Sequence, residues 1–165
     1  MRRLLRDRTL DSRPVNRILD AWLTHRPALQ TLAVFAPLPG EVDLMELTAR
    51  HPERRWVYPR VTGQNLTFHV VKTPAADLAS GAFGILEPSP DLPEIPLEEI
   101  DAFFCPGLAF DPDGGRLGRG KGFYDRMLAN ARPDALKAGV CFPCQIIADT
   151  YAEAHDIHMD EVISE

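Results

Sequence analysis

The residues best suited to chemistry lie in a glycine-rich segment, residues 106–128. Its centre alternates glycines with cations in the order Gly118, Arg119, Gly120, Lys121, Gly122. Because glycine has no Cβ and tolerates positive φ, successive backbone N–H groups in such a loop can turn inward and surround an anion. Arg119 and Lys121 would add full positive charges. The pattern predicts a polyphosphate-binding loop, and the alternative is a solvated surface loop closed by glycine turns.

A short helix is predicted directly after this loop, over residues 123–130, which contain neither glycine nor proline. Its N-terminal dipole would face any anion that the loop binds. Three cations between Arg116 and Lys121 favour the phosphate interpretation, since a solvated loop does not need them. The segment matches neither G-x-x-x-x-G-K-S/T nor a G-x-G-x-x-G after a strand, so the standard nucleotide-binding motifs do not explain it.

Length and charge limit the class of protein. A chain of 165 residues fits a single domain, residues 1–165, with one sizeable core. The net charge of −6 and the isoelectric point near 5.4 disfavour a nucleic-acid partner or an anionic membrane surface, because both favour a broad basic face. No apolar run approaches the roughly 18 to 20 residues of a membrane span. A monomer that acts on small molecules is therefore expected.

The three cysteines, Cys105, Cys141 and Cys144, are too few and too odd in number for a secreted disulfide framework. A reducing, cytoplasmic location fits them better. Cys141 and Cys144 have C-x-x-C spacing, but neither a second pair nor a ligand cluster accompanies them. We therefore predict buried strand residues there and not a metal or redox pair.

Strands and helices are predicted to alternate along the chain. Apolar residues at helical spacing predict a helix over 14–25, and a second helix is expected over 44–50 with Asp43 as its cap. A short basic helix is expected in residues 1–11, and residues 88–96 read as an extended connector. Short apolar runs predict strands over residues 31–36, 55–58, 65–71, 101–105, 137–141, 145–147 and 159–163. A turn at residues 62–64 would join the second and third of these strands, which could form a hairpin. This order predicts an α/β fold, a single-domain three-layer α/β/α arrangement around a central, largely parallel mixed sheet.

Ligands of such sheets bind at the carboxyl ends of the strands, where residues 37–41 and 106–122 would converge. Glu41 follows a Pro-x-Pro-Gly turn and could accept a hydrogen bond from a substrate N–H, or could simply be solvated near a helix N-terminus. His69 lies inside a predicted strand and is expected to be structural. His155 and His158 form either a metal pair or part of a surface loop, whereas Asp156 is a hard carboxylate that suits Mg²⁺.

The glycine-rich segment resembles the sequence motif of the 5-formyltetrahydrofolate cyclo-ligases, also called methenyltetrahydrofolate synthetases. The matching residues are Pro-Gly-Leu-Ala-Phe-Asp at 106–111 and Arg-Leu-Gly-Arg-Gly-Lys-Gly-Phe-Tyr-Asp at 116–125. Shorter similarities are Leu-Pro-Gly-Glu at 38–41, Gly-Ile-Leu-Glu-Pro at 84–88 and the segment 156–162. The resemblance extends over nearly the whole chain.

The resemblance implies that ATP drives the closure of 5-formyltetrahydrofolate to 5,10-methenyltetrahydrofolate, with ADP and phosphate released. Phosphorylation of the formyl oxygen would create a leaving group, and N10 would then displace phosphate. Such a reaction depends on in-line positioning and on neutralising charge at the transferred phosphoryl group. Backbone amides, cations and Mg²⁺ would supply this, and Mg²⁺ is the implied cofactor.

The resemblance also implies a role for individual residues. The catalytic residues would be Arg119, Lys121 and Tyr124. ATP would be bound by Arg2, Arg3, Arg6, Arg116, Leu117, Gly118, Arg119, Gly120, Lys121, Gly122, Phe123 and Tyr124. The folate substrate would be bound by Arg6, Glu41, Arg119, Gly120, Lys121, Gly122 and Phe123. Mg²⁺ would be held by Asp125 and Asp156. Arg2 stands where the family usually has lysine, and Phe123 replaces a frequent tyrosine.

Two other functions remain compatible with the sequence. The chain could be a cyclo-ligase-like binding or regulatory module, although intact Lys121 and Asp125 count against this. It could also be an ATP-dependent ligase or kinase for another small carbonyl compound, because the folate assignment depends on fewer residues than the phosphate site does. An assay with Mg-ATP and 5-formyltetrahydrofolate that follows methenyl absorbance distinguishes the three.

Overall fold

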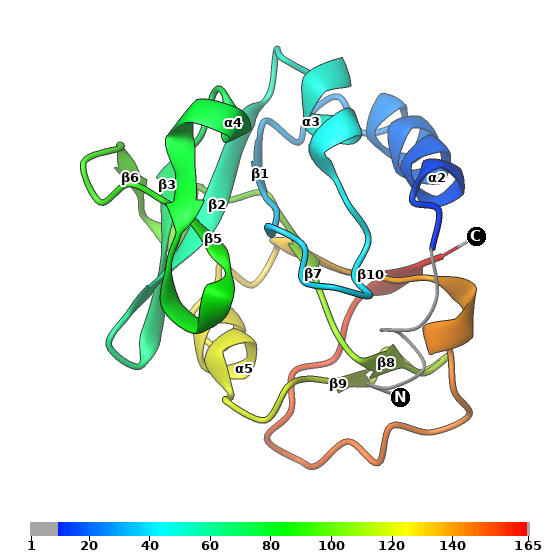
Figure 1. Cartoon of the computed structure of the whole chain (residues 1–165). Coiled ribbons are helices and arrows are strands. Elements are labelled where there is room, and N and C mark those ends of the chain that lie inside the picture. The colour runs from blue at the N-terminus through cyan, green and yellow to red at the C-terminus, as the bar shows by residue number, and fades with distance from the viewer. Residues whose placement is uncertain (1–9, 165) are drawn as a thin grey trace.

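The computed structural model describes residues 10–164, and these form a seven-stranded mixed sheet flanked by helices, with two small two-stranded sheets, β4–β5 and β8–β9 (Figure 1). The helices are α2 Arg13–Thr24, α3 Met45–Arg50, α4 Pro74–Asp77 and α5 Phe123–Leu128, with 3₁₀ turns η1 Ala82–Gly84, η2 Leu97–Glu99 and η3 Pro143–Gln145. The strands are β1 Thr31–Ala33, β2 Arg55–Thr62, β3 Asn65–Val70, β4 Leu78–Ser80, β5 Leu86–Pro88, β6 Glu94–Ile95, β7 Ala102–Cys105, β8 Ala109–Phe110, β9 Arg116–Leu117, β10 Leu136–Val140 and β11 Glu161–Ile163.

The main sheet has the strand order β11-β10-β7-β1-β2-β3-β6 within the described residues. Strands β11, β10, β7, β1 and β2 run parallel to one another, while β3 runs antiparallel to both β2 and β6. From β1 the chain passes through α3 to β2 on one side, and from β7 it passes through α5 to β10 on the other. The direction of winding therefore reverses between the adjacent strands β1 and β7. The predicted α/β class with a largely parallel mixed sheet is confirmed.

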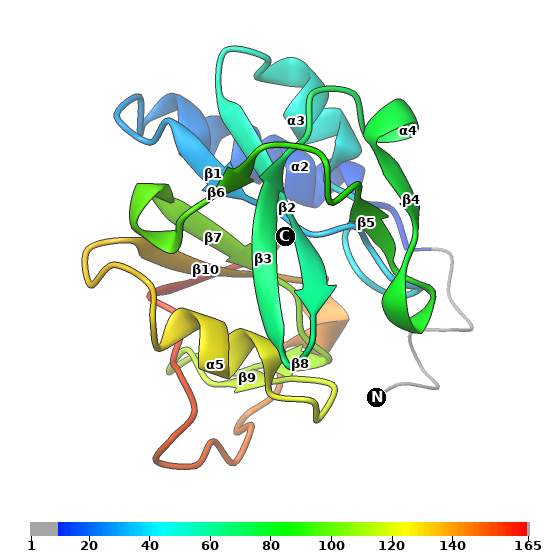
Figure 2. The ribbon, with the colours of Figure 1, turned by 90° about the vertical axis from the view of Figure 1, so that its left-hand side faces the viewer.

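The sheet separates two layers of buried side chains, because successive residues of a strand point to opposite faces. In β7, Ala102 and Phe104 belong to one apolar cluster, and Phe103 and Cys105 belong to the other. The first cluster is covered by α2 and α3 and the second by α5, as the two opposed helical layers in Figure 2 show.

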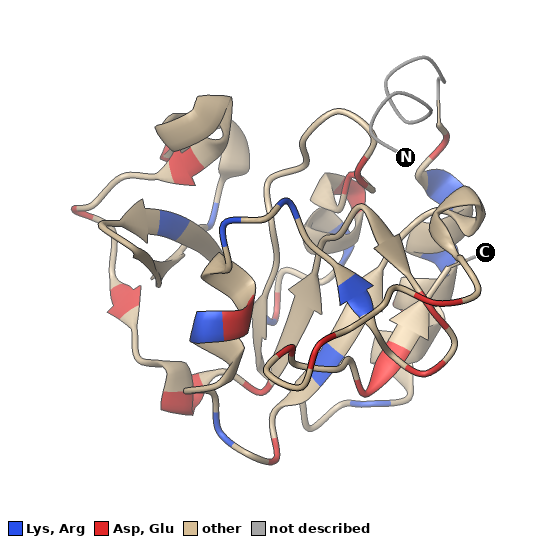
Figure 3. Ribbon diagram, turned by 90° about the horizontal axis from the view of Figure 1, so that it is seen from below, with Lys and Arg blue, Asp and Glu red and all other residues tan. Residues whose placement is uncertain are grey.

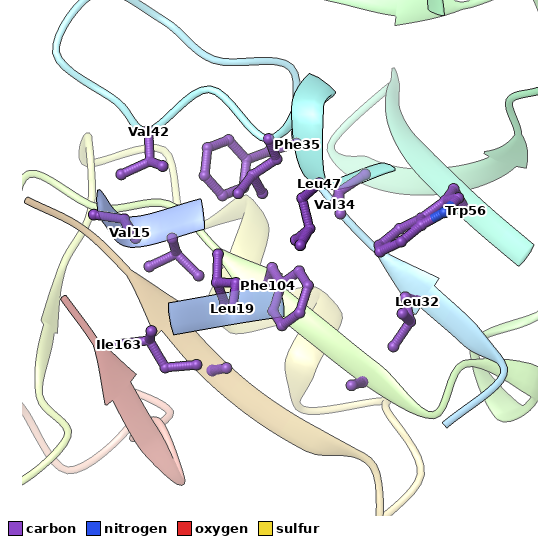
Figure 4. Close-up of a cluster of buried hydrophobic side chains, with 14 of the residues drawn as sticks. Val15, Leu19, Leu32, Val34, Phe35, Val42, Leu47, Trp56, Phe104 and Ile163 are labelled. Atoms are coloured by element: carbon purple, nitrogen blue, oxygen red, sulfur yellow. The ribbon is translucent and has the colours of Figure 1, made fainter. Parts of the chain in front are cut away.

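The apolar residues of α2 recur at helical spacing, and this places them together in the first cluster. Val15, Leu19, Trp22 and Leu23 lie on one face of the helix and are all buried. The Trp22 ring meets the edge of Phe104 from β7, with ring centroids 5.6 Å apart. Figure 4 shows Val15 and Leu19 of α2 in the same cluster as Phe104 of β7 and Ile163 of β11. Helix α2 and the sheet are thereby held as one unit, and the predicted helix over 14–25 is confirmed.

The predicted hairpin and the second helix are also present. Strands β2 and β3 pair antiparallel around a turn at Gly63, although β2 continues beyond the expected residue 58. The N-cap residue of α3 is Leu44 and not the expected Asp43, although Asp43 Oδ1 accepts a hydrogen bond from the Met45 N–H (2.9 Å) at the start of the helix. The strand expected over 31–36 is shorter, because β1 ends at Ala33. The short basic helix expected in residues 1–11 falls mainly on residues 1–9, which lie outside the described part of the chain.

The strand predicted over residues 145–147 is wrong. Residues 143–145 form the 3₁₀ turn η3, and only Ile146 makes an isolated bridge, to Phe110. The Gln145 side chain accepts the Phe142 N–H (2.9 Å) and donates to the Gly107 carbonyl (2.8 Å). A buried side-chain amide thus takes hydrogen bonds that a strand would have supplied, and it joins this turn to the glycine-rich segment.

The predictions for isolated cysteines and histidines are partly confirmed. Cys141 is buried as expected, but Cys144 is exposed within η3, so the prediction of two buried strand residues is wrong for Cys144. His69 is buried and bonded to Thr67 Oγ1 (3.0 Å) and the Leu92 carbonyl (2.9 Å), which is a structural role. Among the described helices, none is long and apolar enough to cross a membrane.

Candidate functional site

A cleft of about 640 Å³ opens at the carboxyl ends of β1 and β7, where the winding of the sheet reverses. This is the place where open α/β sheets bind ligands. Every predicted site residue within residues 10–164 lines this cleft: Glu41, Arg116, Leu117, Gly118, Arg119, Gly120, Lys121, Gly122, Phe123, Tyr124, Asp125 and Asp156. Arg2, Arg3 and Arg6 lie outside the described residues. In Figure 3, basic and acidic positions are interspersed over the side of the ribbon that is in view.

The glycine-rich loop has the backbone that its composition predicts. Gly120 and Gly122 have φ angles of 86° and 67°. A Cβ on Gly120 would meet no atom within 4 Å, so its glycine is required by the backbone angle and not by crowding. Gly122 is the residue at which the loop turns into α5, one position before Phe123. The loop therefore curves as it passes from β9 to α5 along the wall of the cleft.

Arg119 and Glu41 form an ion pair across the cleft. Arg119 donates from Nη2 (2.8 Å) and Nε (3.1 Å) to Glu41 Oε1, and Glu41 Oε2 accepts the Leu38 N–H (2.9 Å). Only 6% of the Glu41 side chain is exposed. The turn after β1 thus fixes this carboxylate, as its Pro-x-Pro-Gly sequence predicted. Its contact with a cation of the glycine-rich loop was not foreseen.

Arg116 and Asp125 form a second ion pair, in the wall of the cleft. Arg116 Nη2 lies 3.1 Å from Asp125 Oδ2, and Nη1 donates to the Pro106 carbonyl (3.3 Å). The Arg116 side chain is 5% exposed. These contacts hold the ends of the glycine-rich segment together, so Arg116 has a structural partner in addition to any ligand.

The two predicted metal carboxylates come from the two segments that meet here. Asp125 Oδ1 accepts the N–H of Ile157 (3.4 Å), the residue next to Asp156. Asp156 Oδ2 accepts the Glu153 N–H (2.7 Å), and its Oδ1 lies 3.7 Å from His155 Nε2. Within residues 10–164, no group of three or more His, Cys, Asp or Glu side chains is placed to hold a metal ion. Two carboxylates suit Mg²⁺ only if a ligand completes its coordination, and phosphate oxygens commonly do so.

An aromatic side chain covers the second cation of the loop. The Lys121 ammonium lies 4.4 Å from the centroid of the Phe83 ring, and the Phe83 and Phe123 centroids are 6.2 Å apart. Phe83 occupies η1 at the tip of the β4–β5 hairpin.

Burial raises the pKa of Tyr124 well above its ordinary value, so its phenol stays protonated at neutral pH. The Arg116 guanidinium lies 5.3 Å from the Tyr124 ring centroid.

Asp111 is a residue of the motif whose role the sequence did not reveal. Its Oδ1 accepts the N–H groups of Asp113 (3.0 Å) and Gly115 (2.8 Å), and its Oδ2 accepts the Thr150 N–H (2.9 Å) and hydroxyl (2.6 Å). These bonds, the Thr150 hydroxyl first, lower the pKa of Asp111 to about 2. A Cβ on Gly115 would overlap both Asp111 and Thr150, so only glycine fits. Asp111 therefore ties the β8–β9 hairpin to the loop that leads to Asp156.

Together, the fold and the cleft define an α/β protein with a ligand site at the switch point of its sheet. The sequence profile of the 5-formyltetrahydrofolate cyclo-ligase family matches residues 21–165. The chain belongs to this family, and so to a class of ligases.

Relatives and solved structures agree with this membership. The chain is 33% identical to the 5-formyltetrahydrofolate cyclo-ligase of Escherichia coli (strain K12), over 86% of this chain and 82% of the relative. It is 29% identical to the enzyme of that name from Mycoplasma pneumoniae, over 92% and 82%. The solved structure of Aquifex aeolicus 5,10-methenyltetrahydrofolate synthetase is similar, with a TM-score of 0.78 and 34% identity over 93% of this chain and 79% of that one.

Proposed function

We propose that this protein catalyses the ATP- and Mg²⁺-dependent cyclisation of 5-formyltetrahydrofolate to 5,10-methenyltetrahydrofolate. The observation that supports it most is the single cleft in which Glu41 faces Arg119 and Lys121 on a glycine-rich loop, in a chain of this family. A cation-bearing loop suits a polyphosphate, and a buried carboxylate on the opposite strand end suits a ring with N–H donors. The cleft therefore offers chemically different places for two substrates.

The reaction needs little acid–base chemistry from the protein. The formyl oxygen attacks the γ-phosphorus of ATP, the bond to ADP breaks, and the formyl carbon becomes part of an iminium phosphate. The N10 nitrogen then adds to that carbon and loses its proton, and the carbon–oxygen bond breaks to release phosphate. The protein has to align the two substrates and neutralise the charge of the transferred group.

Arg119 and Lys121 are the residues proposed to neutralise the phosphates. Both project from the loop between β9 and α5, and each contacts a side chain of the opposite wall, Glu41 or Phe83. Binding of both substrates would exchange these partners, so that Arg119 and Lys121 turn to phosphate oxygens and Glu41 accepts hydrogen bonds from the pterin N–H groups. A buried site built for such donors discriminates strongly against analogues that lack them.

Tyr124 and the two aspartates complete the proposed machinery. Because the Tyr124 phenol stays protonated, it can donate a hydrogen bond to an oxygen of the transferred group. Asp125 and Asp156 would hold Mg²⁺ together with phosphate oxygens, and the ion would withdraw charge from the phosphoryl group when bound. Arg116 already contacts Asp125 and would keep that carboxylate oriented toward the cleft.

The decisive experiment mixes the purified protein with Mg-ATP and 5-formyltetrahydrofolate and follows the absorbance of the methenyl product and the release of phosphate. We expect one phosphate for each methenyl group formed, and no product when ATP or Mg²⁺ is left out. Binding of both ligands without turnover would point instead to a binding module. Phosphate release that needs another carbonyl compound would point to a different ligase or kinase.

A further inference from the structure

Two residues combine an unusual backbone with an exposed aromatic ring. Among the non-glycine residues of the described chain, only Phe83 and Tyr151 have positive φ angles, 58° and 56°. Bulky side chains rarely adopt this conformation because the Cβ crowds the backbone, and such strain gathers at functional sites. Both residues line the cleft, and their exposed fractions of 60% and 84% are the largest among the exposed large hydrophobic residues.

The two rings differ in what they contact. Phe83 packs against Lys121 and Phe123. Tyr151, by contrast, makes no ring–ring or cation–ring contact with any residue in the range 10–164. A large aromatic residue that is 84% exposed and lines a cleft has not been placed there by core packing.

The backbone of Tyr151 is nevertheless held on its N-terminal side. Its N–H donates to Asp149 Oδ1 (2.6 Å), and the preceding residue, Thr150, is fixed through its N–H and hydroxyl to Asp111. Because Asp111 also binds the β8–β9 hairpin, the position of Tyr151 is tied to the segment that leads into the glycine-rich loop. The protein thus holds Tyr151, with its strained backbone and its exposed side chain, at a defined place beside that loop.

We propose that Tyr151 is a substrate-positioning residue that stacks on the base of the nucleotide. This inference depends on the proposed function. Asp156, the proposed magnesium ligand, lies in the same loop only five residues further on. A nucleotide whose phosphates are bound by the glycine-rich loop and whose metal is held by Asp156 would bring its base within reach of Tyr151. Stacking of a base on an aromatic side chain is a common source of affinity for nucleotides.

The charge of the loop favours the base over the folate. Asp149, Glu153 and Asp156 surround Tyr151 in sequence, and Asp156 and Glu153 also line the cleft. Carboxylates at this position would repel the anionic glutamate tail of a folate, whereas adenine is uncharged and can donate hydrogen bonds from its amino group. Glu41, the proposed pterin partner, projects from a different strand end.

The test compares binding of Mg-ATP, Mg-tripolyphosphate and 5-formyltetrahydrofolate to the full chain by calorimetry. Tyr151→Ala is expected to weaken Mg-ATP about tenfold to a hundredfold, the range found when a stacking side chain is removed, and to leave the other two ligands within about twofold. Tyr151→Phe should retain ATP binding. Ile18→Ala, which removes an exposed apolar side chain of α2 outside the cleft, is the matched control.

A fourth variant separates binding from folding. Tyr151→Gly removes the ring and the strain of the positive φ together, so it should raise the melting temperature while weakening Mg-ATP as much as Tyr151→Ala does. Unchanged ATP affinity in Tyr151→Ala, or loss of folate affinity in place of ATP affinity, would overturn the inference. Failure of the unmodified chain to bind Mg-ATP would instead overturn the proposed function, and the inference with it.

Discussion

On each side of the cleft, a buried carboxylate joins neighbouring segments of the chain, but the two do so in different ways. On the glycine side, residues 106–125, Asp111 accepts four hydrogen bonds and is 5% exposed. On the opposite side, which comprises residues 34–41 and the β4–β5 hairpin, Glu87 is 4% exposed. Glu87 accepts the Val61 N–H (3.1 Å) and lies 3.6 Å from Arg60 Nη1.

This difference indicates which wall is rigid and which can adjust. Four bonds to one carboxylate fix the β8–β9 hairpin against the loop at Thr150, where phosphates and metal are proposed to bind. On the opposite side, Glu87 accepts one backbone hydrogen bond, from the Val61 N–H of β2, and the tip of its β4–β5 hairpin carries Phe83. The proposed phosphoryl transfer would need exact alignment on the first side, while the second side would have to release Lys121 when substrate enters. Substitutions on the glycine side should therefore cost more.

The largest effect is expected for Asp111→Asn. The amide offers one acceptor oxygen where the carboxylate offered two, so some of the four donors lose their partner, and charge-assisted bonds contribute about 1.5 to 3 kcal/mol each. We expect the free energy of unfolding to fall by about 2 to 3 kcal/mol and turnover to fall with it. Urea unfolding measures the first and the methenyl assay the second. Asp113→Asn, an exposed neighbour, is the control, and equal loss in both variants would contradict this assignment.

The same carboxylate gives the protein a specific sensitivity to acid. The pKa of Asp111 is lowered from 3.8 to about 2 in the folded protein, so the unfolded chain binds its proton more readily. Its contribution to stability is therefore complete above about pH 4 and is lost as the pH falls toward 2. Unfolding curves between pH 5 and 2 should show a steeper loss of stability for the unmodified protein than for Asp111→Asn. Parallel curves would show that another group is responsible.

Lys121→Ala tests the glycine side through its ligand. Removing an ammonium group from the loop that is proposed to bind a polyphosphate should weaken Mg-ATP by on the order of 2 kcal/mol, or about thirtyfold, with folding unchanged. Calorimetry with Mg-ATP gives the affinity. Lys72→Ala, an exposed lysine outside the cleft, controls for the change in net charge. Wild-type affinity in Lys121→Ala would remove this loop from the phosphate site.

Glu41→Gln tests the opposite side. The amide keeps the shape but presents only one acceptor, so KM for 5-formyltetrahydrofolate is expected to rise about tenfold, which corresponds to about 1.4 kcal/mol. KM for ATP should change far less, because Glu41 is proposed to contact the pterin ring and not the nucleotide. Equal weakening of both substrates would indicate a folding defect. Weakening of ATP alone would place Glu41 in the nucleotide site.

The smallest effect is expected for Glu87→Gln. The amide oxygen can still accept the Val61 N–H, so only the ion pair with Arg60 is weakened. We expect the free energy of unfolding to fall by about 1 kcal/mol or less, with the affinity for Mg-ATP unchanged. A loss as large as that of Asp111→Asn would mean that both walls are equally rigid, and the contrast between the two sides would not hold.

The amino-acid sequence by itself determined the local structure and the composition of the site. Helix α2 follows from apolar spacing, the β2–β3 hairpin from a turn at glycine, and the curved loop from Gly120 and Gly122. The motif also named the stretch of the cleft lining from Arg116 to Asp125, since these residues are neighbours in the chain. Such features depend on backbone preferences and side-chain period, which act over a few residues.

Only the tertiary structure decided which of these residues contact one another. Arg119 pairs with Glu41 across 78 positions of sequence, and Thr150 binds Asp111 across 39. The turn at Gln145 replaced a predicted strand because a buried amide found partners near Gly107, and the strained conformations of Phe83 and Tyr151 have no local sequence signal. Contacts of this kind form when the sheet brings distant segments to one edge, so local preference cannot encode them.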